Sequence, residues 1–349
     1  CKKNYENNKK NSIVMKIFII GCGRILQKHL DSIKFLKKEL KIVGIADINK
    51  TRLNVIAKKI NVEKFLAYKK GIRKTRPDLV SILTPSGNHA KNIIDVLRLK
   101  KNVIVEKPMC LKISDGKKII KLAKKNKKRI FVVMQNKFNL AVLKLREDLN
   151  KLKFGNVFHS SVIVRWMRDQ RYYDNDNWRG TWKLDGGVIS NQASHHIDLL
   201  RTIMGEPSSV FAKSSKHLAK IQCEDTALII FKFKNNKTAI MEATTAMRPK
   251  NIEGSISVLG AKGSAKVGGF ALNKFEYYNL SKKIDLSKYE SNPKSVYGFG
   301  HLKFYKHVLK SLRTKRSSEF EAKDAIKTVK LINAIYKSIE TNKEIFFKN

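Results

Sequence analysis

The segment that decides the fold spans residues 13–36 and reads IVMKIFIIGCGRILQKHLDSIKFL. Its first part is rich in β-branched residues, as a buried strand is, and from Leu26 to Leu36 apolar residues recur at helical spacing. Gly21 and Gly23 separate the two parts. Strand, glycine turn and helix form the context in which a helix N-terminus binds phosphate. We therefore predict a dinucleotide site, although Leu26 replaces the usual third glycine or alanine.

The next predicted strand, residues 42–46, ends at Asp47, about two dozen residues after the glycines. An acid at this place accepts hydrogen bonds from the ribose hydroxyls and repels a 2′-phosphate, which favours NAD over NADP. Lys50 and Arg52 lie close by and leave NADP open.

Strands and helices continue to alternate up to residue 138. Strands are expected at 78–83, 102–105 and 129–134, with a helix at 89–99 and another capped by Ser114 and Asp115. This alternation predicts a parallel, doubly wound sheet with ligands at the carboxyl ends of its strands. The polar residues that follow three of the strands are Thr84, Pro85, Ser86 and His89, then Glu106 and Lys107, then Gln135 and Asn136.

The pattern changes near residue 140. A helix to residue 152 precedes strands at 157–164, 226–233, 238–245, 254–259 and 264–267, and helices follow at 302–312 and 322–339. The fold class is therefore α/β: a Rossmann dinucleotide-binding domain at 15–138 and an α+β domain with an open, mainly antiparallel sheet at 139–349. Residues 1–14 are expected to be disordered or extended, and Met15 is a candidate native start.

Two segments of the second half carry polar side chains suited to a cleft. After Gly186 and Gly187, a helical reading places Asn191, Ser194, His195 and Asp198 on one face and the apolar Ile197, Leu199 and Leu200 elsewhere. This stripe predicts a cleft wall, with a hydrogen-bonded core histidine as the alternative. Residues 165–182 gather arginines and aromatic rings, which favour an anionic ligand.

Composition narrows the classes of function. Lys and Arg total 73 and Asp and Glu 29, a net charge of +44 over 349 residues. The lysines are scattered rather than alternating with aromatic rings, so we interpret them as solvated faces and expect no nucleic-acid partner. The four cysteines form no C-x-x-C pair, and no apolar run approaches the ~20 residues of a membrane span. We expect a cytoplasmic protein with no metal and no membrane partner.

Three motifs together carry a family resemblance: residues 21–25, Glu106-Lys107-Pro108 and residues 186–198. With them the chain, from Met15 almost to its end, resembles the Gfo/Idh/MocA oxidoreductases. The resemblance implies a nicotinamide dinucleotide on the Rossmann domain, a sugar on the second domain, and a homo-oligomer, dimer or tetramer. It also implies that Lys107 and His195 are the catalytic pair. Asn191 and Ala193 stand where the broad family has Asp and Gly.

A closer likeness is to the UDP-N-acetylglucosaminuronate 3-dehydrogenase branch, carried by residues 178–182, 191–195, 251–255 and 295–301. It implies NAD-dependent oxidation of the 3-hydroxyl of a UDP-linked N-acetylated glucuronic acid in surface-polysaccharide synthesis, with 2-oxoglutarate as the hydride acceptor of some members. Asn191 and Ala193 are normal for this branch. Another sugar or cyclitol dehydrogenase of the family is the alternative, and a non-catalytic dinucleotide-binding regulator represents another class.

The predicted site follows from these arguments. We favour His195 as the base because its free pKa lies near neutrality, with Lys107 orienting the hydroxyl; the reverse assignment stays open. The predicted cofactor residues are Gly21, Gly23, Arg24, Ile25, Asp47, Thr84, Pro85, Ser86, His89, Glu106, Lys107, Gln135, Trp178, Arg179 and Tyr297. The predicted substrate residues are Lys107, Arg168, Tyr172, Tyr173, Asn191, Gln192, Ser194 and His195.

Overall fold

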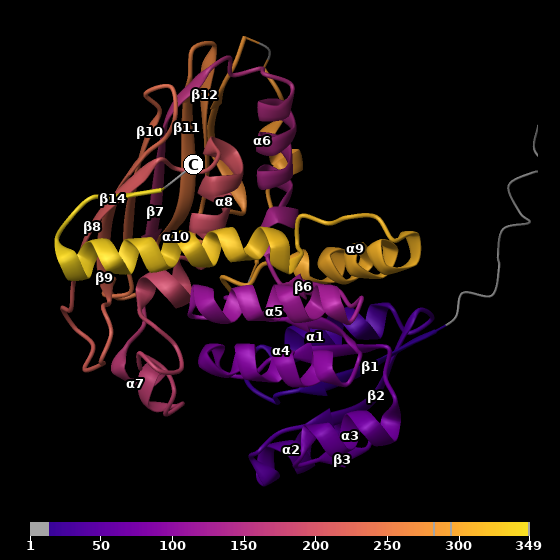
Figure 1. Cartoon of the computed structure of the whole chain (residues 1–349). Helices are drawn as coiled ribbons and strands as arrows, with labels where there is room; N and C mark the ends of the chain where they lie inside the picture. Colours follow the sequence, from indigo (N-terminus) through magenta and orange to yellow (C-terminus); the bar gives the residue numbers. More distant parts are fainter. Residues whose placement is uncertain (1–13, 282, 294, 348–349) are drawn as a thin grey trace, which may run out of the picture.

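The structure is a computed structural model that describes residues 14–281, 283–293 and 295–347. It contains two sheets, one built from the N-terminal part of the chain and one from the C-terminal part (Figure 1). Apart from Val14, the predicted N-terminal segment 1–14 lies outside the described residues. Within those residues, no helix has the length and apolar content that a membrane crossing requires.

The N-terminal sheet has six parallel strands in the order β3-β2-β1-β4-β5-β6, which confirms the predicted doubly wound sheet. The order reverses between β1 and β4, and ligands of such sheets bind at that switch point. The strands are β1 Met15–Ile20, β2 Leu40–Ala46, β3 Lys64–Phe65, β4 Leu79–Ile82, β5 Asn102–Val105 and β6 Ile130–Val132. The helices are α1 Leu26–Phe35, α2 Lys50–Ile60, α3 Tyr68–Thr75, α4 His89–Arg98 and α5 Ile113–Lys125.

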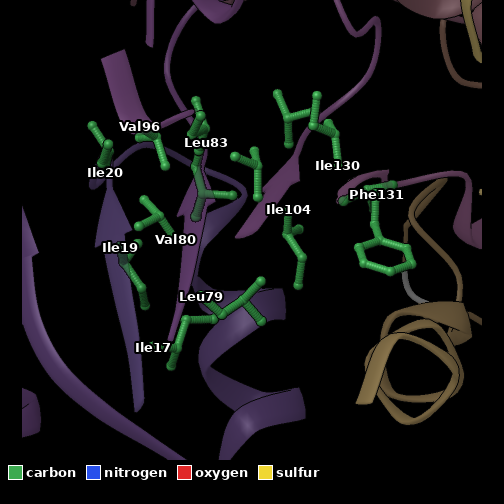
Figure 2. Close-up of a cluster of buried hydrophobic side chains, with 14 of the residues drawn as sticks. Ile17, Ile19, Ile20, Leu79, Val80, Leu83, Val96, Ile104, Ile130 and Phe131 are labelled. Atoms are coloured by element: carbon green, nitrogen blue, oxygen red, sulfur yellow. The ribbon is translucent and has the colours of Figure 1, made fainter. Parts of the chain in front are cut away.

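Continuous apolar runs explain why these segments form a buried parallel sheet. Figure 2 shows Ile17 and Ile19 of β1 beside Leu79 and Val80 of β4, and all four side chains are fully buried. One helix start was predicted wrongly. Helix α5 begins at Ile113 after Lys112, so Ser114 and Asp115 lie in its first turn instead of capping it. Asp115 still interacts favourably with the helix dipole there.

The C-terminal sheet has eight strands in the order β13-β12-β11-β7-β10-β9-β8-β14. Every pair is antiparallel except β7 with β10, so the predicted mainly antiparallel sheet is confirmed. The strands are β7 Val157–Arg165, β8 Ser209–Ser215, β9 Thr226–Lys232, β10 Thr238–Thr244, β11 Glu253–Gly260, β12 Gly263–Gly268, β13 Lys274–Asn279 and β14 Ile345–Phe346. Strands β8, β13 and β14 were not among the predicted ones.

Helices cover one face of this sheet and leave the other open (Figure 1). The remaining helices are α6 Leu140–Asn150, α7 Gln170–Asp174, α8 Ser194–Met204, α9 Gly300–Thr314 and α10 Ala322–Thr341. Helix α9 places Phe304 and Tyr305 in the N-terminal core. Helix α10 crosses both parts: Val329 joins the N-terminal core, whereas Ile332 joins the C-terminal core. The C-terminal helices therefore pack back on the Rossmann sheet.

Candidate functional site

A cleft of about 740 Å³ lies at the carboxyl ends of the parallel strands, between the two sheets. Nearly all of the predicted site residues line it. They are Gly21, Gly23, Arg24, Ile25, Asp47, Thr84, Pro85, Ser86, His89, Glu106, Lys107, Gln135, Arg168, Tyr172, Trp178, Arg179, Asn191, Gln192, His195 and Tyr297. Tyr173 and Ser194 do not line it. The hydroxyl of Tyr173 lies 3.1 Å from that of Thr245, and the hydroxyl of Ser194 donates to the Asn191 carbonyl.

The glycine turn at the start of α1 is built to receive an anion. Gly21 has a φ of +104°, and a Cβ there would lie 2.7 Å from the Leu83 carbonyl oxygen, so only glycine fits. A Cβ on Gly23 would meet nothing within 4 Å. The amides of Gly23, Arg24 and Ile25 make no hydrogen bond to the described part of the chain. Free amides at a helix N-terminus bind phosphate, so these residues fit a dinucleotide pyrophosphate.

Asp47 lies beside this turn at the end of β2. Its carboxylate accepts hydrogen bonds from the amide of Cys22 at 2.6 Å and of Asn49 at 2.7 Å. These bonds fix the acid where a ribose hydroxyl would lie next to the pyrophosphate. Tyr68 and Asn92 also line the cleft and were not predicted. They carry no motif, because α3 and α4 bring them to the strand ends only in the folded chain.

The two loops after β4 and β5 are tied together by His89. Its ring nitrogens lie 2.7 Å from the Pro108 carbonyl oxygen and 2.8 Å from that of Thr84. Burial lowers the pKa of His89. The neutral ring carries one N–H, so it donates to one of the two carbonyl oxygens and packs against the other. Its buried position between the loops helps to fix the Glu106-Lys107-Pro108 segment.

Glu106 lines the cleft and belongs to a buried cluster with His29 and His301. Its carboxylate lies 2.9 Å from Nε2 of His29 and 3.9 Å from Nε2 of His301, and the other His29 nitrogen meets Tyr305 at 2.8 Å. Burial raises the pKa of Glu106, but the two histidines outweigh it and hold that pKa well below its usual range. The donor atoms lie within 4.8 Å of one another and are of metal-ligand type. Direct pairing of His29 with Glu106 favours a network that anchors the glutamate.

Lys107 reaches across the cleft to the C-terminal part. Its Nζ donates to the backbone carbonyl of Asn191 at 2.6 Å and to the Asn191 side-chain oxygen at 3.1 Å. Burial lowers the pKa of Lys107 to about 8, although the charges of Glu106 and Asp185 act in the opposite direction. A lysine with this pKa is partly neutral near physiological pH and can accept a proton.

His195 lines the same wall and is 8% exposed. Burial lowers the pKa of His195 well below its usual value of 6.5, and the positive charge of Lys107 acts in the same direction. The imidazole is therefore neutral at physiological pH. It can donate one hydrogen bond and accept another, as the orientation of a substrate hydroxyl requires.

The predicted polar helix face is interrupted. Residues Val188–Gln192 form a π-helical turn, η3, and α8 begins only at Ser194. Asn191 and His195 line the cleft, whereas Asp198, which follows His195 in the same helix, is buried and ion-paired with Lys137 at 2.8 Å. The prediction that all four side chains form the cleft wall was therefore wrong for Ser194 and Asp198, which are buried in α8. The wide turn η3 follows Gly187, where a Cβ would lie 2.1 Å from the Glu224 carboxylate. The apolar anchors Ile197, Leu199 and Leu200 are buried, as predicted.

The wall beside Asn191 and His195 also carries arginines packed against aromatic rings. The Arg168 guanidinium lies 5.1 Å from the Tyr172 ring and donates to Gln192 at 3.1 Å. The Arg179 guanidinium lies 4.5 Å from the same ring and donates to the Tyr172 hydroxyl at 2.5 Å. Nε of Arg168 is buried and has no acceptor among the described residues. Two cations packed on aromatic faces provide a rigid site for a charged or polar ligand.

A Rossmann cleft with a phosphate-binding turn, closed by a second domain that presents a histidine, defines a dinucleotide-dependent dehydrogenase. Residues 15–134 match the family model described as oxidoreductase family, NAD-binding Rossmann fold, and residues 146–346 match the C-terminal alpha/beta domain of the same family. The chain belongs to the GFO_IDH_MocA oxidoreductase family. It is an NAD-dependent oxidoreductase.

Solved structures and a curated relative agree with this assignment. The WlbA dehydrogenase of Chromobacterium violaceum, solved with NADH and UDP-GlcNAcA, is 32% identical and has a TM-score of 0.90, with 96% of each chain covered. The WlbA dehydrogenase of Bordetella pertussis, solved with the same two ligands, is 30% identical with a TM-score of 0.92, covering 96% of this chain and 98% of that one. The myo-inositol 2-dehydrogenase of Thermotoga maritima is 28% identical over 71% of this chain and 74% of its own length.

Proposed function

We propose that the protein oxidises the 3-hydroxyl of a UDP-linked N-acetylated glucuronic acid, UDP-GlcNAcA, to the 3-keto sugar with NAD. The observation that carries this proposal is the wall beside Lys107 and His195, where Arg168, Tyr172 and Gln192 contact one another. Guanidinium, phenol and amide groups together suit a uronate carboxylate and its neighbouring polar groups. The likeness to two structures that hold UDP-GlcNAcA supports the same substrate.

The chain's own residues divide the work as follows. The amides after Gly21 bind the pyrophosphate, and Asp47 binds the adenosine ribose. Bound NAD supplies the hydride acceptor. Lys107 and His195 hold the sugar hydroxyl from two sides, one on each domain, and so fix the direction of the carbon–hydrogen bond. Arg168 and Tyr172 hold the uronate end.

We assign the base to Lys107 and the orienting role to His195, the reverse of the assignment favoured from free pKa values. The reason is burial, which brings the pKa of Lys107 down to about 8 and moves that of His195 far below neutrality. A base is most effective when its pKa lies near the working pH. Neutral Lys107 takes the hydroxyl proton, and neutral His195 positions the oxygen by a hydrogen bond.

This assignment fixes the sign of the pH dependence. Because the base must be deprotonated, kcat/KM is expected to rise with pH and level off above an apparent pKa near 8. Below that value, the rate falls about tenfold per pH unit. Initial rates of NADH formation between pH 5.5 and 9.5 measure the profile. If His195 were the base, the rising part of the pH profile would lie below pH 6.5, the ordinary pKa of a histidine.

A substrate panel tests the proposed function. The purified protein is incubated with NAD and, in turn, with UDP-GlcNAcA, UDP-GlcNAc, UDP-glucuronate, myo-inositol and free hexoses. Oxidation of the uronate alone, detected as NADH or as the 3-keto product, supports the proposal. A parallel reaction with 2-oxoglutarate reveals turnover that tightly held NADH would hide. Product formation from UDP-GlcNAc as readily as from UDP-GlcNAcA would remove the uronate from the proposal.

A second candidate function is oxidation of a free cyclitol or sugar. The likeness to a myo-inositol 2-dehydrogenase favours it. Both candidates use the same Lys107 and His195, so mutation of these residues does not separate them. The panel does, because a cyclitol dehydrogenase turns over inositol and ignores the nucleotide.

We also propose that the protein is a homo-oligomer built on the open face of the C-terminal sheet. Leu228 and Ile230 of β9 and Ile240 of β10 point outward there and are 59%, 51% and 50% exposed. Ile230 and Ile240 are direct cross-strand partners, so the apolar surface is continuous. A second copy would bury it. Sedimentation velocity is expected to show a dimer or tetramer that Ile230→Glu shifts to smaller species; a monomeric wild type contradicts the proposal.

A further inference from the structure

The side chain that holds Lys107 is itself held by a buried acid. Lys107 approaches the oxygen of the Asn191 amide, so the amide nitrogen faces the other way. That nitrogen donates to Oδ1 of Asp185, and Oδ2 of Asp185 accepts from the Gly180 amide at 2.7 Å. Asp185 is 2% exposed and does not line the cleft. A chain of hydrogen bonds thus runs from Asp185 through Asn191 to Lys107.

Asp185 supplies a negative charge near Lys107, which the side chain of Asn191 cannot supply. The Asn191 amide carries no charge, whereas the broad family pattern has an acid at position 191. A buried carboxylate costs several kcal/mol unless nearby groups compensate it. Here the compensating groups are the Gly180 amide, the Asn191 amide and two cations, Arg179 and Lys107.

We propose that Asp185 is a positioning residue for Lys107: its carboxylate orients the Asn191 amide and supplies the negative charge that faces the ammonium group. In the broad family pattern the acid is residue 191; in this chain the acid is residue 185, which is connected to Lys107 through the Asn191 amide. This inference rests on the proposed function of Lys107 as the base and adds a buried group that orients its partner Asn191.

Charged and titratable groups of the described residues face both members of the pair. Lys107 is faced by Glu106, Asp185, Arg179, Arg168 and His195. Asp185 is faced by Arg179, Lys107, Glu224, Cys223 and Tyr173. Burial raises the pKa of Asp185 to about 6, so the acid is ionised over the pH range in which Lys107 titrates. Asp185 and Glu106 are therefore the two anions that favour the ammonium form of Lys107.

The test measures the pKa of Lys107 directly. Limiting acetic anhydride labels the neutral amine, and peptide mass spectrometry quantifies labelling of Lys107 between pH 6 and 11. Asp185→Asn is expected to lower the pKa of Lys107 by about one unit, because an opposite charge is lost. It is also expected to lower kcat about tenfold with KM less affected, because the amide loses its fixed orientation.

A charge swap makes the test specific. In the double variant Asp185→Asn/Asn191→Asp the carboxylate returns to the position of the broad family pattern, and both the Lys107 pKa and kcat are expected to recover most of the loss. Asn191→Asp alone is expected to raise the Lys107 pKa, which keeps the proposal testable if Asp185→Asn does not fold. An unchanged Lys107 pKa in Asp185→Asn, or in Asn191→Asp, would overturn it.

Glu224→Gln is the matched control. Glu224 is a second buried carboxylate beside the same glycine pair, but it accepts from the Ile189 amide and the Tyr336 hydroxyl, each at 3.0 Å, and contacts neither Asn191 nor Lys107. Its removal is expected to leave the Lys107 pKa unchanged. A shift as large as that of Asp185→Asn would contradict a specific role. Labelling needs no substrate, so it remains readable if the uronate proves not to be the substrate.

Discussion

Replacing Lys107 with methionine is expected to lower kcat about 10³-fold, within the range that general acid–base groups contribute. Methionine keeps the length of the side chain but can neither accept the hydroxyl proton nor stabilise the developing alkoxide. Binding of NAD is expected to persist, because the glycine turn and Asp47 lie elsewhere in the cleft. Single-turnover NADH formation measures the first effect, and calorimetric titration with NAD measures the second.

Two further variants serve as a control and a comparison for Lys107→Met. Lys118→Met, on the exposed face of α5, removes one of the many surface lysines and is expected to be silent. His195→Asn keeps a neutral hydrogen-bonding group in place of a neutral ring, so we expect a smaller loss than for Lys107→Met. Near-normal single turnover in Lys107→Met would exclude this residue as the base.

Replacing Asp198 with alanine is expected to cost about 3–5 kcal/mol of stability, the usual penalty for breaking a buried ion pair. The carboxylate pairs with Lys137 at 2.8 Å and Arg201 at 3.3 Å and accepts from the Thr328 hydroxyl at 2.7 Å. It joins α8 to α10 and to the turn that carries Lys137. Without it, two buried cations lose a partner. The urea-unfolding midpoint, followed by circular dichroism, measures the loss.

The pH dependence of this contribution has a defined sign. Burial raises the pKa of Asp198, but Lys137, Arg201 and Thr328 outweigh burial and hold it below the ordinary value of 3.8. The stabilisation is therefore present above the ordinary pKa and is lost as the pH falls through the folded-state pKa. Glu147→Ala breaks an exposed pair with Lys151 and is the control, with little change expected. A midpoint for Asp198→Ala equal to that of the control would contradict the prediction.

The Rossmann half was predictable because its signals are local. Buried strands, the glycine turn and Asp47 each follow from a short stretch, and strand order then brings them to one edge. Strands β3, β8, β13 and β14 were not predicted, because their formation depends on pairing with strands elsewhere in the fold. The C-terminal sheet type still followed from several strands with few helices between them.

Partners distant in sequence explain the errors at the site. Helical spacing placed Asp198 with His195, but its ion-pair partner Lys137 and hydrogen-bond partner Thr328 lie on other elements. Asp185 gave no signal, since its hydrogen bond with Asn191 forms only in the folded chain. The relative pKa values of Lys107 and His195 depend on burial, which the sequence does not report.

The path of α10 bears on how the chain folds during synthesis. Domains usually fold as units in the order in which they leave the ribosome. Here the Rossmann sheet comes first, yet Phe304, Tyr305 and Val329 complete its core. The nascent sheet must therefore wait, with part of its apolar surface uncovered, until α9 and α10 have been made. Helix α10 also contributes Ile332 to the core of the C-terminal part. Both cores are therefore completed only when α10 has packed.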